Sequence, residues 1–244
     1  MLQEPMLAQA EGSGRCPSGV RRFFEKGQMR ANLSLIEGDC MAGLRGMGDN
    51  SFSLAICDPP YGGNDAIGMK DCKRQSAQAT ARNHYKEFEN VTPPRVYFDE
   101  IRRVSKRQIM WGCNFFDGMG LGGGRIVWDK KGTAFGRAEM ASYSNSKSVQ
   151  IFEYAWNGMI QGDMKHKEVR IHSTQKPVAL YKWLLANYAH PGDTILDSHL
   201  GSMSIAVACW DMGFDLTGYE LDHDYYTAGV ERVEKHKSQG QFEF

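Results

Sequence analysis

The sequence predicts an α/β fold built around a largely parallel β-sheet. Short apolar segments alternate along the chain with longer segments whose apolar residues recur at helical spacing. The apolar segment that ends at residue 57 is continuous rather than alternating, which is typical of a strand buried on both faces of a sheet. The chain has 244 residues, of which 41% are hydrophobic, so it can bury one sizeable core and we expect a single domain.

The apolar and periodic segments give the order of the expected elements. Strands are expected within residues 31–40, 51–61, 107–112, 124–129, 149–156, 194–197 and 215–222. Helices are expected within residues 93–105, 173–193 and 198–213, and in a last segment that runs through residue 234. In the first helix, the residues expected on the buried face are Val96, Phe98 or Tyr97, Ile101 and Val104. Ser173 or Thr174 is expected to cap the second helix.

The remaining segments suggest tails and loops around one domain. Residues 1–30 show no sustained period and are expected to form a flexible N-terminal tail, and residues 237–244 a C-terminal tail. Residues 31–236 would form the domain. Residues 64–92 are polar and irregular, and residues 130–170 offer a second short irregular stretch. We expect these two stretches to serve as recognition loops.

Composition excludes several classes of protein. Lys plus Arg and Asp plus Glu both number 29, so the overall charge does not select an acidic or basic partner. The six cysteines form no C-x-x-C pair, and the seven histidines lack the close spacing of metal ligands, so we expect reduced thiols and no metal site. Apolar runs stay well short of the roughly 20 residues that span a membrane. We therefore expect a soluble cytoplasmic protein.

The balanced total hides a polarised distribution of charge. Between residues 190 and 234, nine acidic residues oppose one arginine, whereas ten basic residues oppose five acidic ones between residues 70 and 107. A basic middle segment beside an acidic C-terminal part is what an enzyme acting on a polyanion would need.

The acidic C-terminal part carries a pattern typical of nucleoside-binding sites. Asp197 closes an expected strand, Gly201 lies in the turn before a helix, and Glu220 ends the next strand. In α/β sheets such a glycine permits close approach of the ligand, and such an acid accepts hydrogen bonds from ribose hydroxyls. The turn lacks a G-x-G-x-x-G series, which favours a nucleoside cofactor without pyrophosphate. Spacing alone supports a structural role for these residues equally well.

A second pattern lies after the apolar strand, in the segment Asp58-Pro59-Pro60-Tyr61. The two prolines fix two φ angles and can aim the Asp58 carboxylate and the Pro59 carbonyl at one point. Two converging acceptors suit an exocyclic amino group, which has two N–H donors, and Tyr61 offers a flat face for a base. The alternative is a proline-rich turn that merely ends the strand.

Taken together, these motifs resemble the S-adenosylmethionine-dependent amino-methyltransferases of DNA. The motifs are Asp58–Tyr61, then Thr174-Gln175-Lys176-Pro177, then Asp197 with Gly201-Ser202, then Glu220, in the order of the family's permuted β group. The resemblance covers roughly residues 31–236. It implies a Rossmann-like methyltransferase fold with a mostly parallel twisted sheet, one antiparallel strand and helices on both faces.

The resemblance also implies roles for individual residues. The amino nitrogen of a flipped base would attack the methyl group, with Asp58 and Pro59 as acceptors, Pro60 fixing the turn and Tyr61 stacking on the base. The residues implied for S-adenosylmethionine are Asp39 near the adenine, Glu220 on the ribose, Thr174 and Lys176 near the methionine end, and Asp197, Gly201 and Ser202 in the turn; His172 is added from its place beside Thr174. The D-P-P-Y form favours adenine N6 over cytosine N4, whose enzymes more often have serine first.

Two residues of the turn depart from the family pattern D-P-F-x-G-S-G. His199 stands where the family has an aromatic that lines the cofactor pocket, and Met203 where it has a glycine. An imidazole can still stack or hydrogen-bond, so we expect cofactor binding to persist and include His199 among the cofactor residues. The rival interpretation is a nucleic-acid-binding protein whose cofactor site has decayed.

DNA is the expected partner, in a methylase of bacterial, phage or prophage type. RNA or a cytosine amino group are alternative substrates. The sequence leaves open a homodimer and a cognate restriction nuclease, and the short recognition segments predict a recognition site of few bases.

Overall fold

The computed structural model describes residues 31–62, 90–132, 136–157 and 160–239. The expected N-terminal tail lies outside these residues, as does nearly all of the expected loop at 64–92. The strands are β1 (Leu33–Glu37), β2 (Leu54–Cys57), β3 (Gln108–Trp111), β4 (Gly124–Asp129), β5 (Ala138–Tyr143), β6 (Val149–Glu153), β7 (Thr194–Asp197) and β8 (Asp215–Glu220). The helices are α1 (Cys40–Gly46), α3 (Arg95–Val104), the 3₁₀ turn η2 (Cys113–Phe115), α4 (Val178–Tyr188), α5 (Ser204–Met212) and α6 (His223–Gln239).

One sheet of eight strands organises the fold, in the order β1-β8-β7-β2-β3-β5-β4-β6. Strand β5 pairs antiparallel with both β3 and β4, and the remaining pairs are parallel. The expected α/β class and the single antiparallel strand are therefore confirmed. Because β7, β8 and β2 run in the same direction, the residues that follow them meet at one edge of the sheet.

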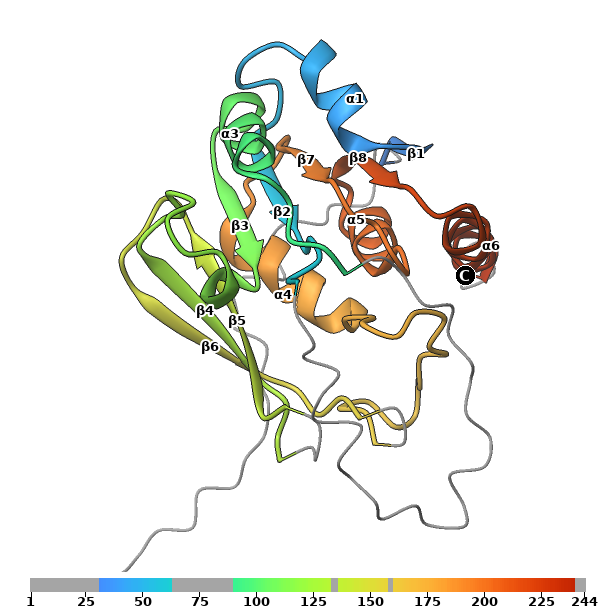
Figure 1. The fold of residues 1–244 in the computed structure, drawn as a ribbon. Coiled ribbons are helices and arrows are strands. Elements are labelled where there is room, and N and C mark those ends of the chain that lie inside the picture. The colour runs from blue at the N-terminus through green and yellow to red at the C-terminus, as the bar shows by residue number, and fades with distance from the viewer. Residues whose placement is uncertain (1–30, 63–89, 133–135, 158–159, 240–244) are drawn as a thin grey trace, which may run out of the picture.

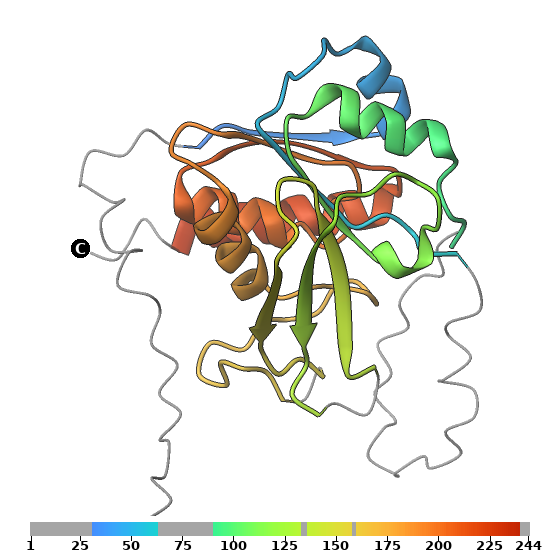
Figure 2. The same cartoon turned by 90° about the vertical axis from the view of Figure 1, so that its left-hand side faces the viewer.

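Helices cover both faces of the sheet (Figures 1 and 2). Alternate residues of β2 show this arrangement directly, since successive side chains of a strand point to opposite faces. Leu54 and Ile56 pack into the cluster that contains α4 and α5, whereas Ala55 and Cys57 pack into the cluster that contains α1 and α3. The strand is buried throughout, as its continuous apolar sequence predicted.

Besides the short 3₁₀ turn η2, two elements were not predicted from the sequence. Strand β5 is rich in Ala, Glu and Ser, which have low strand propensity, and it is held by its pairing with β3 and β4. Helix α1 has two glycines in seven residues and depends on its cap, because the side chain of Asp39 accepts a hydrogen bond from the backbone of Met41. Residues 130–170 thus contain the unpredicted strand β5 besides the expected strand β6, and are not one irregular loop.

Three local expectations were wrong. Helix α4 begins after Pro177 without a side-chain cap from its own segment, and Glu168 accepts the hydrogen bond from the Val178 amide instead of Ser173 or Thr174. In α3, Val96 is 45% exposed, and the buried residues are Tyr97, Phe98, Ile101 and Val104. The expected C-terminal tail begins too early, since α6 continues to Gln239. Within the described residues, no helix is long and apolar enough to cross a membrane.

The unusual Met203 is built into the core. It has φ of 57°, in the left-handed region that favours glycine, and its side chain is fully buried. Gly229 of α6 makes room for it, because a Cβ at Gly229 would lie 2.7 Å from the Met203 Cγ. Burial of the thioether side chain thus offsets the cost of the backbone conformation.

Replacing Met203 with glycine, the residue of the family pattern, should destabilise the protein. Relief of the left-handed conformation returns about 1–2 kcal/mol, whereas loss of a buried methionine side chain costs about 2–5 kcal/mol. We expect a net loss of about 1–3 kcal/mol, which lowers the melting temperature by roughly 2–10 °C in a thermal unfolding experiment. Met203→Ala should be less stable still, because it keeps a Cβ in the left-handed region. A Met203→Gly variant as stable as the wild type would refute this balance.

Candidate active site

The residues of both motifs meet at the carboxyl edge of the sheet. Asp58 follows β2, Asp197 ends the neighbouring β7, and Glu220 ends β8 beside it. Burial raises the pKa of Asp197, and the charges of Asp58 and Glu220 raise it further, so the three carboxyl groups influence one another. The sequence placed these groups 139 and 23 positions apart along the chain, and the topology brings them together.

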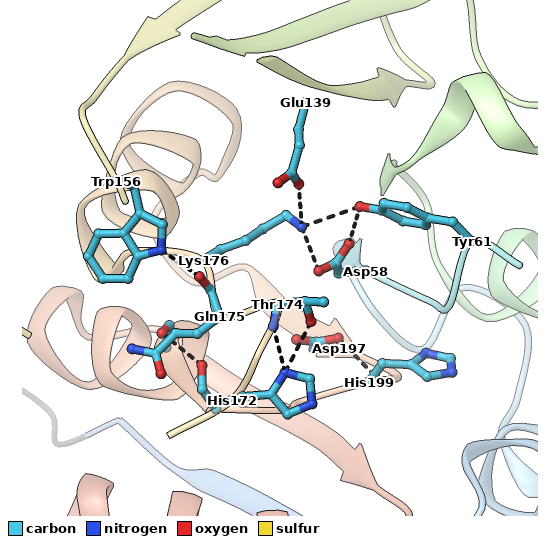
Figure 3. Close-up of polar contacts among 12 residues, drawn as sticks. Asp58, Tyr61, Glu139, Trp156, His172, Thr174, Gln175, Lys176, Asp197 and His199 are labelled. Atoms are coloured by element: carbon cyan, nitrogen blue, oxygen red, sulfur yellow. Dashed lines mark hydrogen bonds and ion pairs between the residues drawn. The ribbon is translucent and has the colours of Figure 1, made fainter. Parts of the chain in front are cut away.

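Asp58 is held by two donors (Figure 3). The Tyr61 hydroxyl donates to Asp58 Oδ1 at 2.6 Å, and Lys176 Nζ donates to Asp58 Oδ2 at 2.6 Å. Lys176 Nζ also lies 2.9 Å from Glu139 Oε2 and 3.3 Å from the Tyr61 hydroxyl. The Lys176 side chain is only 2% exposed, so its ammonium depends on these partners.

The charges of this group sustain one another. Burial alone would lower the pKa of Lys176, but Asp58 and Glu139 outweigh burial and raise it. Burial alone would raise the pKa of Glu139, but Lys176 and Lys130 hold it at about 2. Lys176 was expected near the methionine end of a cofactor. The structure places its ammonium between Asp58 and Glu139. Its positive charge also partly opposes the rise in the pKa of the nearby Asp197 that burial causes.

Tyr61 lies in an aromatic corner formed by η2. Its ring stacks on Phe115, with centroids 5.0 Å apart and an interplanar angle of 12°, and meets Phe116 edge-on at 6.0 Å. Gly112 permits this packing: it has φ of 70°, and a Cβ there would lie 2.1 Å from the Tyr61 ring. Pro59 is buried and Pro60 is half-buried in the turn that precedes the ring.

One oxygen of Asp197 has no partner among the described residues. Oδ1 accepts the His199 amide at 3.0 Å, whereas Oδ2 is buried and accepts no hydrogen bond from the part of the chain that the structure describes. Burial, with smaller contributions from Asp58 and Glu220, raises the pKa of Asp197 to about 8. A buried, unsatisfied carboxyl oxygen in a turn at the edge of a sheet is suited to bind a ligand donor.

The turn after β7 is tied to β8 and to α6. The Gly201 amide donates to Glu220 Oε2 at 2.7 Å. Ser202 is buried, and its carbonyl accepts a hydrogen bond from Arg232 at 2.6 Å, while Arg232 also pairs with Glu168 at 2.7 Å. The loop that precedes α4 and the turn that precedes α5 are thereby fixed to one helix.

His199 serves as a neutral aromatic group. Burial lowers the pKa of His199 to about 4. Its Nδ1 lies 2.9 Å from Ser198 Oγ, which is itself 2.6 Å from the Tyr97 hydroxyl, and its ring meets the Tyr97 ring edge-on at 5.5 Å. The histidine therefore fills an aromatic position without adding a charge.

His172, Thr174 and Asp39 lie around the same turn. Burial lowers the pKa of His172 to about 4; its Nδ1 lies 3.0 Å from Thr174 Oγ1, and its ring packs on Tyr225 with centroids 4.2 Å apart. A Cβ at Gly201 would lie 3.9 Å from the His172 ring. The negative charge of Asp39, the capping residue of α1, partly opposes the effect of burial on the pKa of His199.

Part of the basic middle segment is paired within the chain. Arg103 bonds Glu100 and Asp49, and Arg107 bonds Asp193, so these arginines support the fold. Lys130 donates to Glu139, and its side chain is only 14% exposed. Most of the other basic residues of this segment lie outside the described residues.

Glu139 is the residue of the site that sequence reasoning missed. It belongs to none of the motifs, and its strand was not predicted. Because β5 runs antiparallel to β3, the start of β5 lies at the edge where β2 and β7 end. An acidic residue inside an otherwise small and apolar stretch was the only signal. Among the described residues, no group of three or more His, Cys, Asp or Glu side chains could hold a metal ion.

Comparisons with known proteins find similarity to DNA methylases. Residues 122–231 match a family model described as DNA methylase, which spans Lys176, Asp197 and Glu220. The chain is 26% identical over 206 residues to the putative methylase YubD of Escherichia coli K12, covering 81% of this chain and 88% of that protein. It is 33% identical over 67 residues to the DNA adenine methyltransferase YhdJ of Escherichia coli K12, covering 28% of this chain and 23% of that protein.

Solved structures show the same fold. The PvuII DNA methyltransferase, which is cytosine-N4-specific, superposes with a TM-score of 0.56 at 12% identity, covering 87% of this chain and 94% of that chain. TTHA0409 of Thermus thermophilus, a putative DNA modification methylase solved with S-adenosylmethionine, gives a TM-score of 0.52 at 13% identity, covering 84% of this chain and 94% of that chain. These two likenesses show a shared fold, and the DNA methylase family model matches residues 122–231, which are 110 of the 244 residues of the chain.

Proposed function

We propose that this protein transfers a methyl group from S-adenosylmethionine to the exocyclic amino group of a base flipped out of DNA, with adenine N6 as the target. The observation that carries the proposal is the meeting of the Asp58–Tyr61 turn and the Asp197 turn at the carboxyl ends of two adjacent strands. Asp58, an acceptor for an amino group, thus lies near Asp197, whose unsatisfied carboxyl oxygen is suited to a donor group of a cofactor.

The residues of the Asp197 turn fit the proposed cofactor. The buried, unpartnered Oδ2 of Asp197 would accept a donor from the amino-acid part, and Glu220 would accept from ribose hydroxyls. The neutral His199 ring offers an aromatic surface, with Asp39 beside it and Gly201, Ser202, His172 and Thr174 completing the turn and its surroundings. Solved TTHA0409, which shares the fold, holds the same cofactor.

On the substrate side, the chain positions and orients the amino group. When bound, S-adenosylmethionine supplies an electrophilic methyl group; the amino nitrogen gains this carbon and loses a proton, and the sulfur keeps the electron pair of the broken bond. Asp58 would accept an amino hydrogen and the Pro59 carbonyl the second, which turns the nitrogen lone pair toward the methyl group. Pro60 keeps the turn extended, and Tyr61 would stack on the base.

Adenine is favoured by the D-P-P-Y form of the motif and by the likeness to YhdJ, a DNA adenine methyltransferase. Cytosine N4 is the second candidate, because the PvuII enzyme of the same fold is cytosine-N4-specific. The short segments available for base reading further suggest a recognition site of few bases, and we expect the enzyme to act on DNA in the cytoplasm.

Replacing Asp58 with asparagine tests the catalytic part of the proposal. We expect kcat for methyl transfer to DNA to fall by at least about 100-fold, because the amide removes a charged acceptor for the amino hydrogen. Lys176 keeps Glu139 as a partner, so the fold should persist. Binding of S-adenosylmethionine, measured by calorimetry, should stay within a few-fold of wild type. Asp49→Asn, at an exposed ion pair, is the matched control. An active Asp58→Asn variant would exclude the role given to the carboxylate.

The pKa of Asp197 predicts how cofactor binding depends on pH. With a pKa of about 8, free Asp197 is mostly protonated at pH 7, whereas a bound ammonium favours its ionised form. Binding should therefore release a proton, and affinity should rise between pH 6 and pH 7.5 by up to about tenfold per pH unit. Calorimetry in buffers of different ionisation enthalpy measures the released proton. Asp197→Asn should bind more weakly and abolish the release; unchanged release in this variant would contradict the assignment.

A further inference from the structure

Glu139 is a partly buried acid, with a side chain 25% exposed, for which the proposed reaction has given no role. It lies on β5, outside the Asp58–Tyr61 and Asp197 turns, and contacts the active site through Lys176. Lys176 Nζ lies 2.6 Å from Asp58 and 2.9 Å from Glu139, so a single ammonium is shared between two carboxylates (Figure 3).

The sharing of the Lys176 ammonium between two carboxylates determines the net charge next to a target amino group. Asp58 and Lys176 alone form a neutral pair. When the amino nitrogen accepts a methyl group, it gains positive charge, and a nearby unopposed ammonium would disfavour that change. With Glu139 included, the three side chains carry one negative charge. Lys130 contacts the other oxygen of Glu139. The side chains of Lys130 and Glu139 are 14% and 25% exposed, whereas that of Lys176 is 2% exposed, so solvent screens the Lys130–Glu139 pair while the charge of Lys176 stays poorly screened.

The surroundings of Lys176 strengthen this effect. Its ammonium lies over the Trp111 ring at 5.2 Å and near the Tyr61 ring at 5.8 Å, and both rings exclude water from it. The Trp111 side chain is fully buried. In such a dry site, a fixed charge acts on its neighbours far more strongly than it would in water.

We propose that Glu139 is a positioning residue that neutralises Lys176, so that Asp58 presents a net negative charge to the amino nitrogen during methyl transfer. The inference rests on the proposed function, because it concerns the charge that develops on the methylated nitrogen. It assigns to Glu139 an effect on the rate of transfer at saturating cofactor and DNA.

Glu139→Gln in the full-length chain removes this charge and keeps the shape of the side chain. We expect kcat on long unmethylated duplex DNA to fall by about tenfold or more. KM for DNA and the affinity for S-adenosylmethionine should stay within about threefold, because Glu139 has no direct role in either site. Glu139→Asp keeps the charge and should recover most of kcat. Glu153→Gln on β6, a strand separated from β5 by β4, alters an exposed ion pair with Lys131; it is the matched control and should behave as wild type.

A double variant separates charge balance from support of the fold. Lys176→Met in the Glu139→Gln background again leaves one net negative charge, that of Asp58. We expect the double variant to have a kcat at least about threefold above that of Glu139→Gln alone. A double variant that is equally slow or slower would overturn the inference, as would full activity of Glu139→Gln. Failure of the wild type to methylate DNA would instead overturn the proposed function, so the two failures are distinguishable.

Discussion

The active site depends on one buried ammonium. Lys176 reaches from the segment before α4 to Asp58 after β2 and to Glu139 on β5, and so joins three parts of the chain that lie far apart in sequence. Removing a partner from a buried ion pair leaves an uncompensated charge, which costs about 3–5 kcal/mol. The same contacts that hold the substrate side of the site therefore stabilise the fold around it, and the shape of the site follows from the need to satisfy this one charge.

The parts of the site that are formed by contiguous residues could be predicted from the sequence. The parts that depend on contacts between distant segments could not. The Asp58–Tyr61 turn and the Asp197 turn are contiguous, and the alternation of strands and helices predicts that both end at one edge of the sheet. Glu139 could not be found in this way, because its strand has weak propensity and is held by pairing with β3 and β4. The prediction of the α4 cap was wrong for a related reason. The residue that caps this helix is Glu168, which is held by Arg232 and lies outside the segment in which a capping residue is expected from the sequence.

The two departures in the cofactor turn have different physical explanations. Met203 adopts the left-handed backbone of a glycine, and its cost is offset by burial against Gly229 on α6. His199 keeps an aromatic ring at its position and stays neutral, because burial lowers its pKa to about 4 and Tyr97 packs on it edge-on. Both residues are accommodated by partners elsewhere in the fold, and Asp197 retains a free buried oxygen. The turn is therefore compatible with a working cofactor site. A nucleic-acid-binding protein with a decayed cofactor site would not need to keep these features.

The most direct test of the proposed reaction is the identity of the modified nucleoside. Long unmethylated duplex DNA and a matched RNA would be incubated with the full-length protein and S-adenosylmethionine carrying a labelled methyl group, then digested to nucleosides and separated. We expect the label in N6-methyladenine from DNA, and its loss in the Asp58→Asn variant. Label in N4-methylcytosine would contradict the choice of base, label from RNA alone would contradict the choice of nucleic acid, and no label in either would contradict the proposed reaction itself.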